Sequence, residues 1–341
     1  MDAQGWETEM SRNVKLSLTM FDLLKGTAMI AVILLHSIDW DIQEQIGWKM
    51  LYSVLMPAFF VTSGYWMKPR KITAGIKGAA KQILRPYLLT ILAIEVIGLV
   101  HRLATGNFQN WLDVFFLPGL LGMSGPGTRF GPLWFLLALF WAWVFFYLTA
   151  SVENERLQIG LAVLSGIAGG AWISFNPPFQ LAQGLIGFFY LYCGYYLKKK
   201  KLLQNELELK IALPAVLYWL LMVYFGSMDM GMYRIRYGFL SIVGSLFGAV
   251  LLIRFFLRID FMKNPVADGL RTVGRYTMWI LCVHGLEGAV VPWNILFRYV
   301  EKDTWAGCFL WFVLRLTVVA VGCAVLEQWN RIRLRRMIAE R

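Results

Sequence analysis

The chain has 341 residues, of which 58% are hydrophobic and 16% are charged, and its formal net charge is +12. Its mean hydropathy of +0.56 exceeds what a water-soluble domain of this length requires. Apolar runs recur from end to end, each close to the roughly 20 residues with which a helix crosses about 30 Å of hydrocarbon. These continuous runs predict an integral membrane protein built from helices, and they exclude a β-barrel, whose strands are short and alternate in polarity.

We therefore expect an all-α, polytopic membrane helix bundle that forms a single domain over residues 1–341, without a separate soluble domain. In chain order, its ten predicted spans are 17–38, 46–67, 84–104, 132–150, 157–175, 179–197, 209–226, 236–257, 273–292 and 306–327. The segment 103–131 contains an apolar portion that is broken by Pro118 and is too short to cross. It predicts either a re-entrant or interfacial piece or a connector at the membrane surface.

The positive charge is distributed unevenly over the loops between these spans. If the N-terminus lies inside, most Lys and Arg fall on one side, including the 68–85 loop, the Lys198–Lys201 run and the 331–341 tail. The positive-inside rule then places both termini in the cytoplasm. Topology and anionic lipid explain the basicity, so we expect membrane lipids as partners and no nucleic acid. Only Lys25 and Arg315 lie well within predicted spans.

The first predicted span carries Asp22, Lys25 and His36, and Asp39 follows it. Lys25 and His36 are eleven residues apart, which is three helical turns plus about 20°, so they share one face about 16 Å apart. Ionisable residues inside a membrane normally face the bundle interior or a water-filled cavity. The stripe therefore predicts the lining of a path through the membrane. The alternative is a buried Asp22–Lys25 ion pair with His36 as an interfacial anchor.

These residues resemble the opening helix of the acyltransferase family 3 membrane proteins, which carries D-x-x-R-G and R-x10-H. Asp22, Lys25, Gly26 and His36 match those patterns, with Lys25 in place of the arginine of many members. Further similar motifs follow in the family's order: MPAFFVTSGYWM (56–67), KQILRPYLL (81–89), GPLWFLLALF (131–140), FYLYCGYYLKKK (189–200) and VGRYTMWILCVH (273–284). In the last motif, Thr277 stands where serine is usual, and His284 matches the family's histidine.

The resemblance implies a membrane O-acyltransferase, most often an O-acetyltransferase, of the bacterial cytoplasmic membrane. Such proteins move an acyl group from cytoplasmic acetyl-CoA or another acyl-CoA to a hydroxyl of an extracytoplasmic or lipid-linked sugar or glycan. On this interpretation His36 is the general base or the acyl carrier. Lys25 holds the donor or stabilises the thioester oxyanion, and Asp22 keeps Lys25 oriented.

Other residues have supporting roles in this interpretation. Lys77, Lys81 and Arg85 are spaced four apart and predict a basic ridge that either binds the phosphates of coenzyme A or only anchors the loop at the membrane. We also expect supporting roles for a set of polar residues comprising Ser63, Arg129, and His284 with Glu287, which lie one turn apart and can pair. The three histidines show no metal-ligand spacing, so we expect no metal site.

Two other functions fit the residues of the first span. One is a small-molecule transporter or exporter that uses Asp22, Lys25 and His36 as an intramembrane relay. The other is a membrane module that binds a small ligand without catalysis. The sequence names neither the acceptor nor the oligomeric state.

Overall fold

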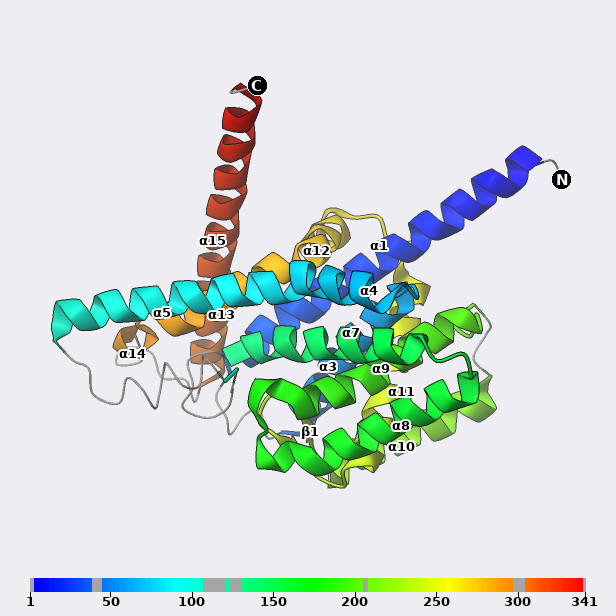
Figure 1. The fold of residues 1–341 in the computed structure, drawn as a ribbon. Helices are drawn as coiled ribbons and strands as arrows, with labels where there is room; N and C mark the ends of the chain where they lie inside the picture. Colours follow the sequence, from blue (N-terminus) through cyan, green and yellow to red (C-terminus); the bar gives the residue numbers. More distant parts are fainter. Residues whose placement is uncertain are drawn as a thin grey trace.

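The computed structural model describes residues 3–38, 45–106, 121–122, 131–204, 208–296 and 304–339, and most of them are helical (Figure 1). The α-helices are α1 (Ala3–Leu35), α3 (Ile46–Trp66), α4 (Ile72–Ala79), α5 (Arg85–Thr105), α7 (Trp134–Ala150), α8 (Glu155–Trp172), α9 (Leu181–Lys199), α10 (Leu209–Phe225), α11 (Phe239–Ile259), α12 (Pro265–Arg275), α13 (Thr277–Val290), α14 (Trp293–Leu296) and α15 (Trp305–Ala339). The short elements are the π-helical turn η1 (Ala80–Leu84), the 3-10 turns η3 (Gly131–Leu133), η4 (Ile173–Phe175) and η5 (Pro178–Gln180), and the antiparallel strands β1 (Met228–Asp229) and β2 (Arg234–Ile235).

Each predicted span coincides with a helix, and the structure is nearly all helical as predicted, apart from the short β1–β2 hairpin. Among the described residues, five helices are long and apolar enough to cross a membrane: Ile72–Thr105, Gly131–Ala150, Glu155–Phe175, Phe239–Ile259 and Trp305–Gln328. Leu209–Phe225 and Thr277–Val290 are apolar but shorter. The predicted spans 17–38, 46–67 and 179–197 correspond to α1, α3 and α9. Ten crossings and cytoplasmic termini therefore stay predictions. Most of the predicted 103–131 segment lies outside the described residues.

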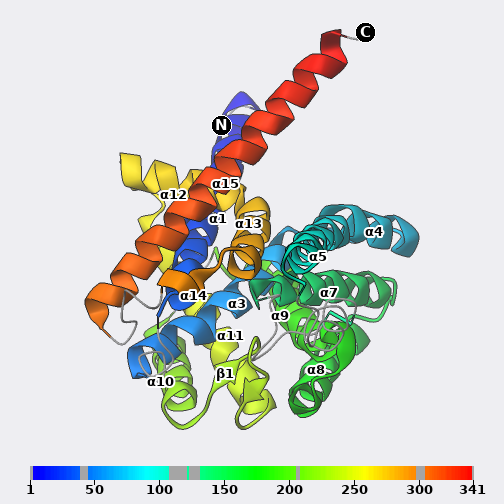
Figure 2. The same ribbon diagram turned by 90° about the vertical axis from the view of Figure 1, so that its left-hand side faces the viewer.

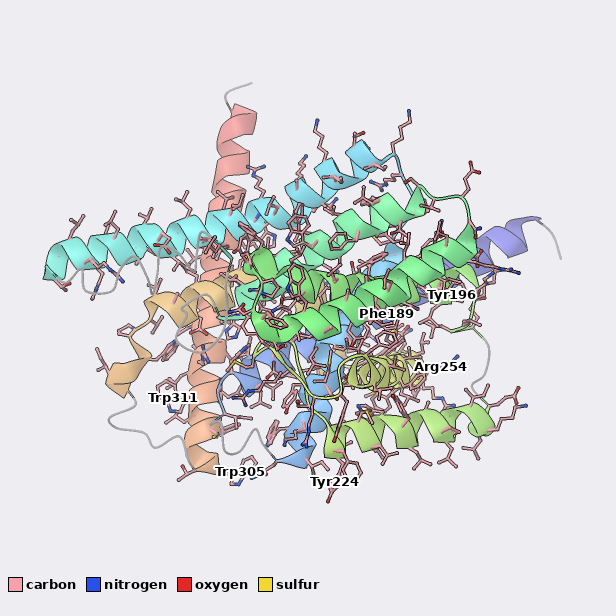
Figure 3. The ribbon with its side chains drawn as sticks, turned by 60° about the horizontal axis from the view of Figure 1, so that its bottom comes forward. Phe189, Tyr196, Tyr224, Arg254, Trp305 and Trp311 are labelled. Atoms are coloured by element: carbon pink, nitrogen blue, oxygen red, sulfur yellow. The ribbon has the colours of Figure 1, made fainter. Side chains whose placement is uncertain are left out.

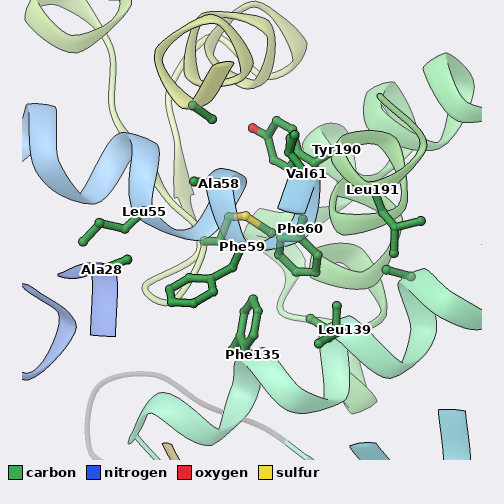
Figure 4. Close-up of a cluster of buried hydrophobic side chains, with 14 of the residues drawn as sticks. Ala28, Leu55, Ala58, Phe59, Phe60, Val61, Phe135, Leu139, Tyr190 and Leu191 are labelled. Carbon is green, nitrogen blue, oxygen red and sulfur yellow. The ribbon is translucent and has the colours of Figure 1, made fainter. Parts of the chain in front are cut away.

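Helix α9 packs against α3, α7 and α8, and its contact with α3 is unusually close. A Cβ atom on Gly64 of α3 would lie 1.8 Å from the carbonyl oxygen of Leu191, and one on Gly194 of α9 would lie 2.0 Å from that of Val61. Only glycine permits this approach, because any side chain would force the two backbones apart. Figure 4 shows the core beside this crossing, with Phe59 and Phe60 of α3 directed toward Phe135 of α7.

A second glycine crossing joins α1 to α12. A Cβ atom on Gly26 would lie 1.9 Å from the carbonyl oxygen of Leu270, and one on Gly274 would lie 1.8 Å from that of Asp22. The chain then turns at Tyr276 and continues as α13, which packs against α5 and α15. The crossing therefore fixes the Asp22 and Lys25 turn of α1 next to the start of α13.

Helix α15 runs transverse to α5, α7 and α8, which lie roughly side by side, and it projects beyond the bundle in both views (Figures 1 and 2). It contacts α13 and α1. Figure 3 shows Tyr196 and Arg254 toward one side of the molecule, and Tyr224 and Trp305 toward another. Tyr224 and Trp305 lie at helix ends, as the aromatic residues of a membrane interface do.

Candidate active site

A cavity of about 510 Å³ lies between α1, α3, α7, α13 and the β1–β2 hairpin. Both Lys25 and His36 line it, so the predicted stripe on α1 faces one continuous space. Helix α1 is unbroken from Ala3 to Leu35, so the two side chains lie at different depths, which we call the Lys25 end and the His36 end. The rest of the wall is mainly apolar and aromatic, as in small-molecule sites.

At the His36 end, two histidines 248 residues apart in the sequence are in contact. Nδ1 of His36 lies 3.1 Å from Nε2 of His284. Nδ1 of His284 lies 2.8 Å from Oε1 of Glu287, so the predicted pairing of these two residues is present. The imidazole of His36 is exposed within the cavity, whereas the His284 side chain is 0% exposed and that of Glu287 is 2% exposed. The histidine pair therefore connects the cavity to a buried carboxylate.

Glu287 also contacts Arg315 and Trp293. Arg315 donates from Nε to Oε1 of Glu287 at 3.0 Å, and Trp293 donates from Nε1 to Oε2 at 2.7 Å. Arg315 donates in addition to the backbone carbonyl oxygen of His36. One guanidinium thus holds both ends of the Glu287–His284–His36 chain, and the buried negative charge is compensated.

The hydrogen-bond partners determine which nitrogen atoms carry protons. The Glu287 carboxylate can only accept, so His284 donates to it from Nδ1–H. Nε2 of neutral His284 is then an acceptor, and His36 donates to it from Nδ1–H. Nε2 of His36 then carries the lone pair of the ring, which is the arrangement a general base or a nucleophile needs.

At the Lys25 end, Nζ of Lys25 lies 2.9 Å from Oδ1 of Asp22, and their side chains are 28% and 22% exposed. The ion pair that the sequence allowed is therefore present, and it is accessible rather than fully buried. Lys25 reaches the cavity wall, whereas Asp22 lies behind it on the same face. Because about 16 Å of helix separates Lys25 from His36, Lys25 acts on a different part of any ligand than His36 does.

Polar groups of α3 and α13 complete the wall. Ser63 lines the cavity, and its Oγ accepts a hydrogen bond from Trp143 Nε1 at 3.0 Å. Thr62 also lines the cavity, but its hydroxyl oxygen is buried and has no hydrogen-bond partner among the described residues. Thr277 lines the cavity as well and donates to Gly274 O at 3.3 Å.

The predicted basic ridge does not reach the cavity. Lys77, Lys81 and Arg85 are all exposed, and none of them lines the cavity. Lys81 lies in the π-helical turn Ala80–Leu84, so the regular α-helical spacing assumed for the ridge is interrupted. Arg129 and Asp39 lie outside the described residues.

Two parts of the site were not assigned from the sequence. Arg315 lies within the predicted span 306–327, and its position inside an apolar run was the signal for a functional role. The other part is the hairpin segment Met228–Met232, whose residues all line the cavity. That segment is short and has no motif, so nothing local pointed to it.

Comparison with known families decides the class of protein. A family model described as an acyltransferase domain matches residues 19–327. The chain belongs to acyltransferase family 3. The match begins just before Asp22 and ends after Arg315, so it includes every residue of the cavity and of the His36–His284–Glu287 chain. Neither a search of curated proteins nor a search of solved structures gave a match. The protein is thus an integral membrane acyltransferase by family and by architecture.

Proposed function

We propose that this acyltransferase family 3 protein transfers an acyl group, most simply acetyl, from an acyl-CoA to a hydroxyl of an extracytoplasmic or lipid-linked sugar. One observation carries the proposal. The hydrogen-bonded chain from Glu287 through His284 ends at His36, which is exposed in a cavity that Lys25 also lines. The bacterial cytoplasmic membrane is the location that the family suggests.

In the proposed reaction, the acceptor hydroxyl lies against His36 and the thioester carbonyl lies next to it. The hydroxyl oxygen attacks the thioester carbon, and its proton passes to Nε2 of His36. A C–O bond forms, the C–S bond breaks, and the proton returns from His36 to the leaving thiolate. The positive charge on His36 during this step is stabilised through His284 by the Glu287 carboxylate.

Lys25 acts at the other end of the cavity. Of its two predicted roles, we favour donor binding over stabilisation of the oxyanion, because a lysine side chain does not cover the about 16 Å that separate it from His36 along α1. Lys25 instead binds the donor's polar arm, and Asp22 keeps its ammonium directed to the wall. Ser63, which lines the cavity, is a further hydrogen-bonding group for that arm.

The test is acyl transfer by the purified protein in nanodiscs, followed as thiol release from acetyl-CoA and as ester formation on lipid-linked sugars. His36→Ala is expected to lower kcat by about 10²- to 10⁴-fold, the usual contribution of a general base. His101→Ala is the matched control, because His101 is exposed on α5 and does not line the cavity. Undiminished transfer by His36→Ala contradicts the assignment.

The same preparation distinguishes the alternatives. An acyl group found on His36 by mass spectrometry of the intact protein would make it the acyl carrier instead of the base. Uptake of a solute into proteoliposomes without any acyl donor would favour the transporter function, and ligand binding without transfer would favour a binding module.

A further inference from the structure

The end of α9 carries consecutive lysines that face two directions. Lys199 and Lys200 contact the carboxylate of Glu155 at 2.8 and 3.0 Å. Lys198 lies instead over the ring of Trp66, with its Nζ 4.5 Å from the ring centroid. Within the described part of the chain, no carboxylate pairs with Lys198. This cation therefore faces an aromatic surface, and no anionic partner for it is found among the described residues.

That aromatic surface belongs to the cavity. Trp66 lines the wall together with Lys25 and Ser63, and its indole contacts Phe21 with ring centroids 5.6 Å apart. Phe21 lies one turn before Lys25 and on the side away from His36, so Trp66 marks the Lys25 end. The close α3–α9 crossing at Gly64 and Gly194 holds the end of α9 over the end of α3, which brings Lys198 to this position.

A second cation follows in the sequence. Lys68 is exposed and lies two residues beyond Trp66, the residue over which Lys198 lies. Lys198 lies just beyond the predicted span 179–197, and burial together with repulsion from Lys68 lowers the pKa of its ammonium. Two neighbouring ammonium groups without a carboxylate repel each other, and an anion placed between them removes that repulsion.

We propose that Lys198 and Lys68 bind a phosphate group of the acyl-CoA donor at the Lys25 end of the cavity. The site rests on the proposed function, since it requires that donor. From this position, the donor's uncharged arm would pass Trp66 and enter the cavity beside Lys25. The site takes the place of the predicted ridge of Lys77, Lys81 and Arg85, which does not adjoin the cavity. A lipid headgroup carries the same phosphate chemistry, but the contact with a cavity-lining residue favours the donor.

The experiment measures CoA binding to the purified full-length protein in nanodiscs of neutral lipid, by isothermal titration. Lys198→Gln and Lys68→Gln are each expected to weaken CoA binding about tenfold or more, because each variant loses a charge-assisted hydrogen bond. The KM for acyl-CoA should rise by the same factor while kcat is kept. Transfer from acyl-pantetheine, which lacks these phosphates, should not change. Lys198→Arg should bind CoA nearly as the wild type does.

The matched control is Lys199→Gln, which removes the neighbouring charge at the Glu155 pair. It is expected to bind CoA as the wild type does. If Lys199→Gln weakens CoA binding as much as Lys198→Gln does, the effect comes from basic charge in general, and the proposed site is wrong. If Lys81→Gln weakens CoA binding and Lys198→Gln does not, the phosphates bind at the predicted ridge instead. Because Lys68 is exposed, Lys68→Gln gives an answer even if Lys198→Gln fails to fold.

The same measurements distinguish an error in the phosphate site from an error in the proposed function, and donor binding from lipid binding. If the wild type binds CoA and transfers acyl groups, but neither lysine variant changes this, only the site is wrong. A wild type that neither binds CoA nor transfers contradicts the proposed function and the site with it. If the variants bind CoA normally but lose thermal stabilisation by phosphatidylglycerol in nanodiscs, the site binds a lipid headgroup and the donor assignment is wrong.

Discussion

The two ends of the cavity are built differently. At the His36 end, His284, Glu287, Arg315 and Trp293 form a connected network in which each of these groups has a hydrogen-bond partner. At the Lys25 end, the helices pack closely but the polar side-chain contacts of the described residues are fewer. Lys25 has an accessible pair with Asp22, and the buried Thr62 hydroxyl has no partner in the described residues.

This difference indicates a division of work. A fully paired buried network holds a reacting group in one geometry and one tautomer, which is what a chemical step requires. An accessible cation that lines a cavity, as Lys25 does, is available to a ligand and contributes to its binding. Changes at the His36 end should therefore act on kcat, and changes at the Lys25 end should act on KM and on the packing of α1.

Arg315→Met is expected to have the largest effect on stability. It leaves the buried Glu287 carboxylate without its guanidinium, and breaking such a pair costs about 3–5 kcal/mol. The measurement is chemical unfolding in detergent, with Arg234→Met as the control because Arg234 is exposed at the hairpin. An unchanged unfolding free energy in Arg315→Met would mean that the network at the His36 end is not a structural unit.

His284→Ala tests whether the network serves the chemistry. The loss of its partner leaves the tautomer of His36 undetermined, so we expect kcat to fall about 10²-fold with KM unchanged. Added imidazole should restore part of kcat by occupying the space that the side chain leaves. If His284 only packs against its neighbours, imidazole should not restore kcat. A rise in KM would place His284 among the binding groups instead.

Gly274→Ala acts at the Lys25 end. Its methyl group would lie 1.8 Å from the carbonyl oxygen of Asp22, so α12 must move away from α1, at a cost of about 1–3 kcal/mol. The matched control is Gly160→Ala on α8, where a Cβ atom meets nothing within 4 Å and alanine favours the helix. We expect a lower thermal midpoint and a higher KM for the first variant only. A fall in kcat at constant KM would contradict the division between the two ends.

Much of the local structure could be predicted from the sequence. The apolar runs gave the helices in order, because a chain that crosses hydrocarbon must satisfy its backbone hydrogen bonds within each segment. Helical periodicity placed Lys25 and His36 on one face, and it placed His284 one turn from Glu287. The motif order indicated the family, which the match over residues 19–327 confirms.

Contacts between helices were not predictable in the same way. The basic ridge illustrates this limit, since the spacing of Lys77, Lys81 and Arg85 in the sequence revealed neither the π-helical turn at Lys81 nor that none of the three residues lines the cavity. Met228–Met232 shows the converse, because this segment forms part of the wall without any local signal. Spacing along one helix carries no information about which other helix lies opposite.

The sequence alone therefore determined that this is a helical membrane protein with His36 and Lys25 on one face of its first span, because those features depend on neighbours along the chain. Only the tertiary structure decided that His36 contacts His284 and that Arg315 holds Glu287. It also decided that Lys198 lies over Trp66. These contacts depend on how closely the helices approach, and glycines such as Gly64 and Gly194 set that distance through the side chains they lack.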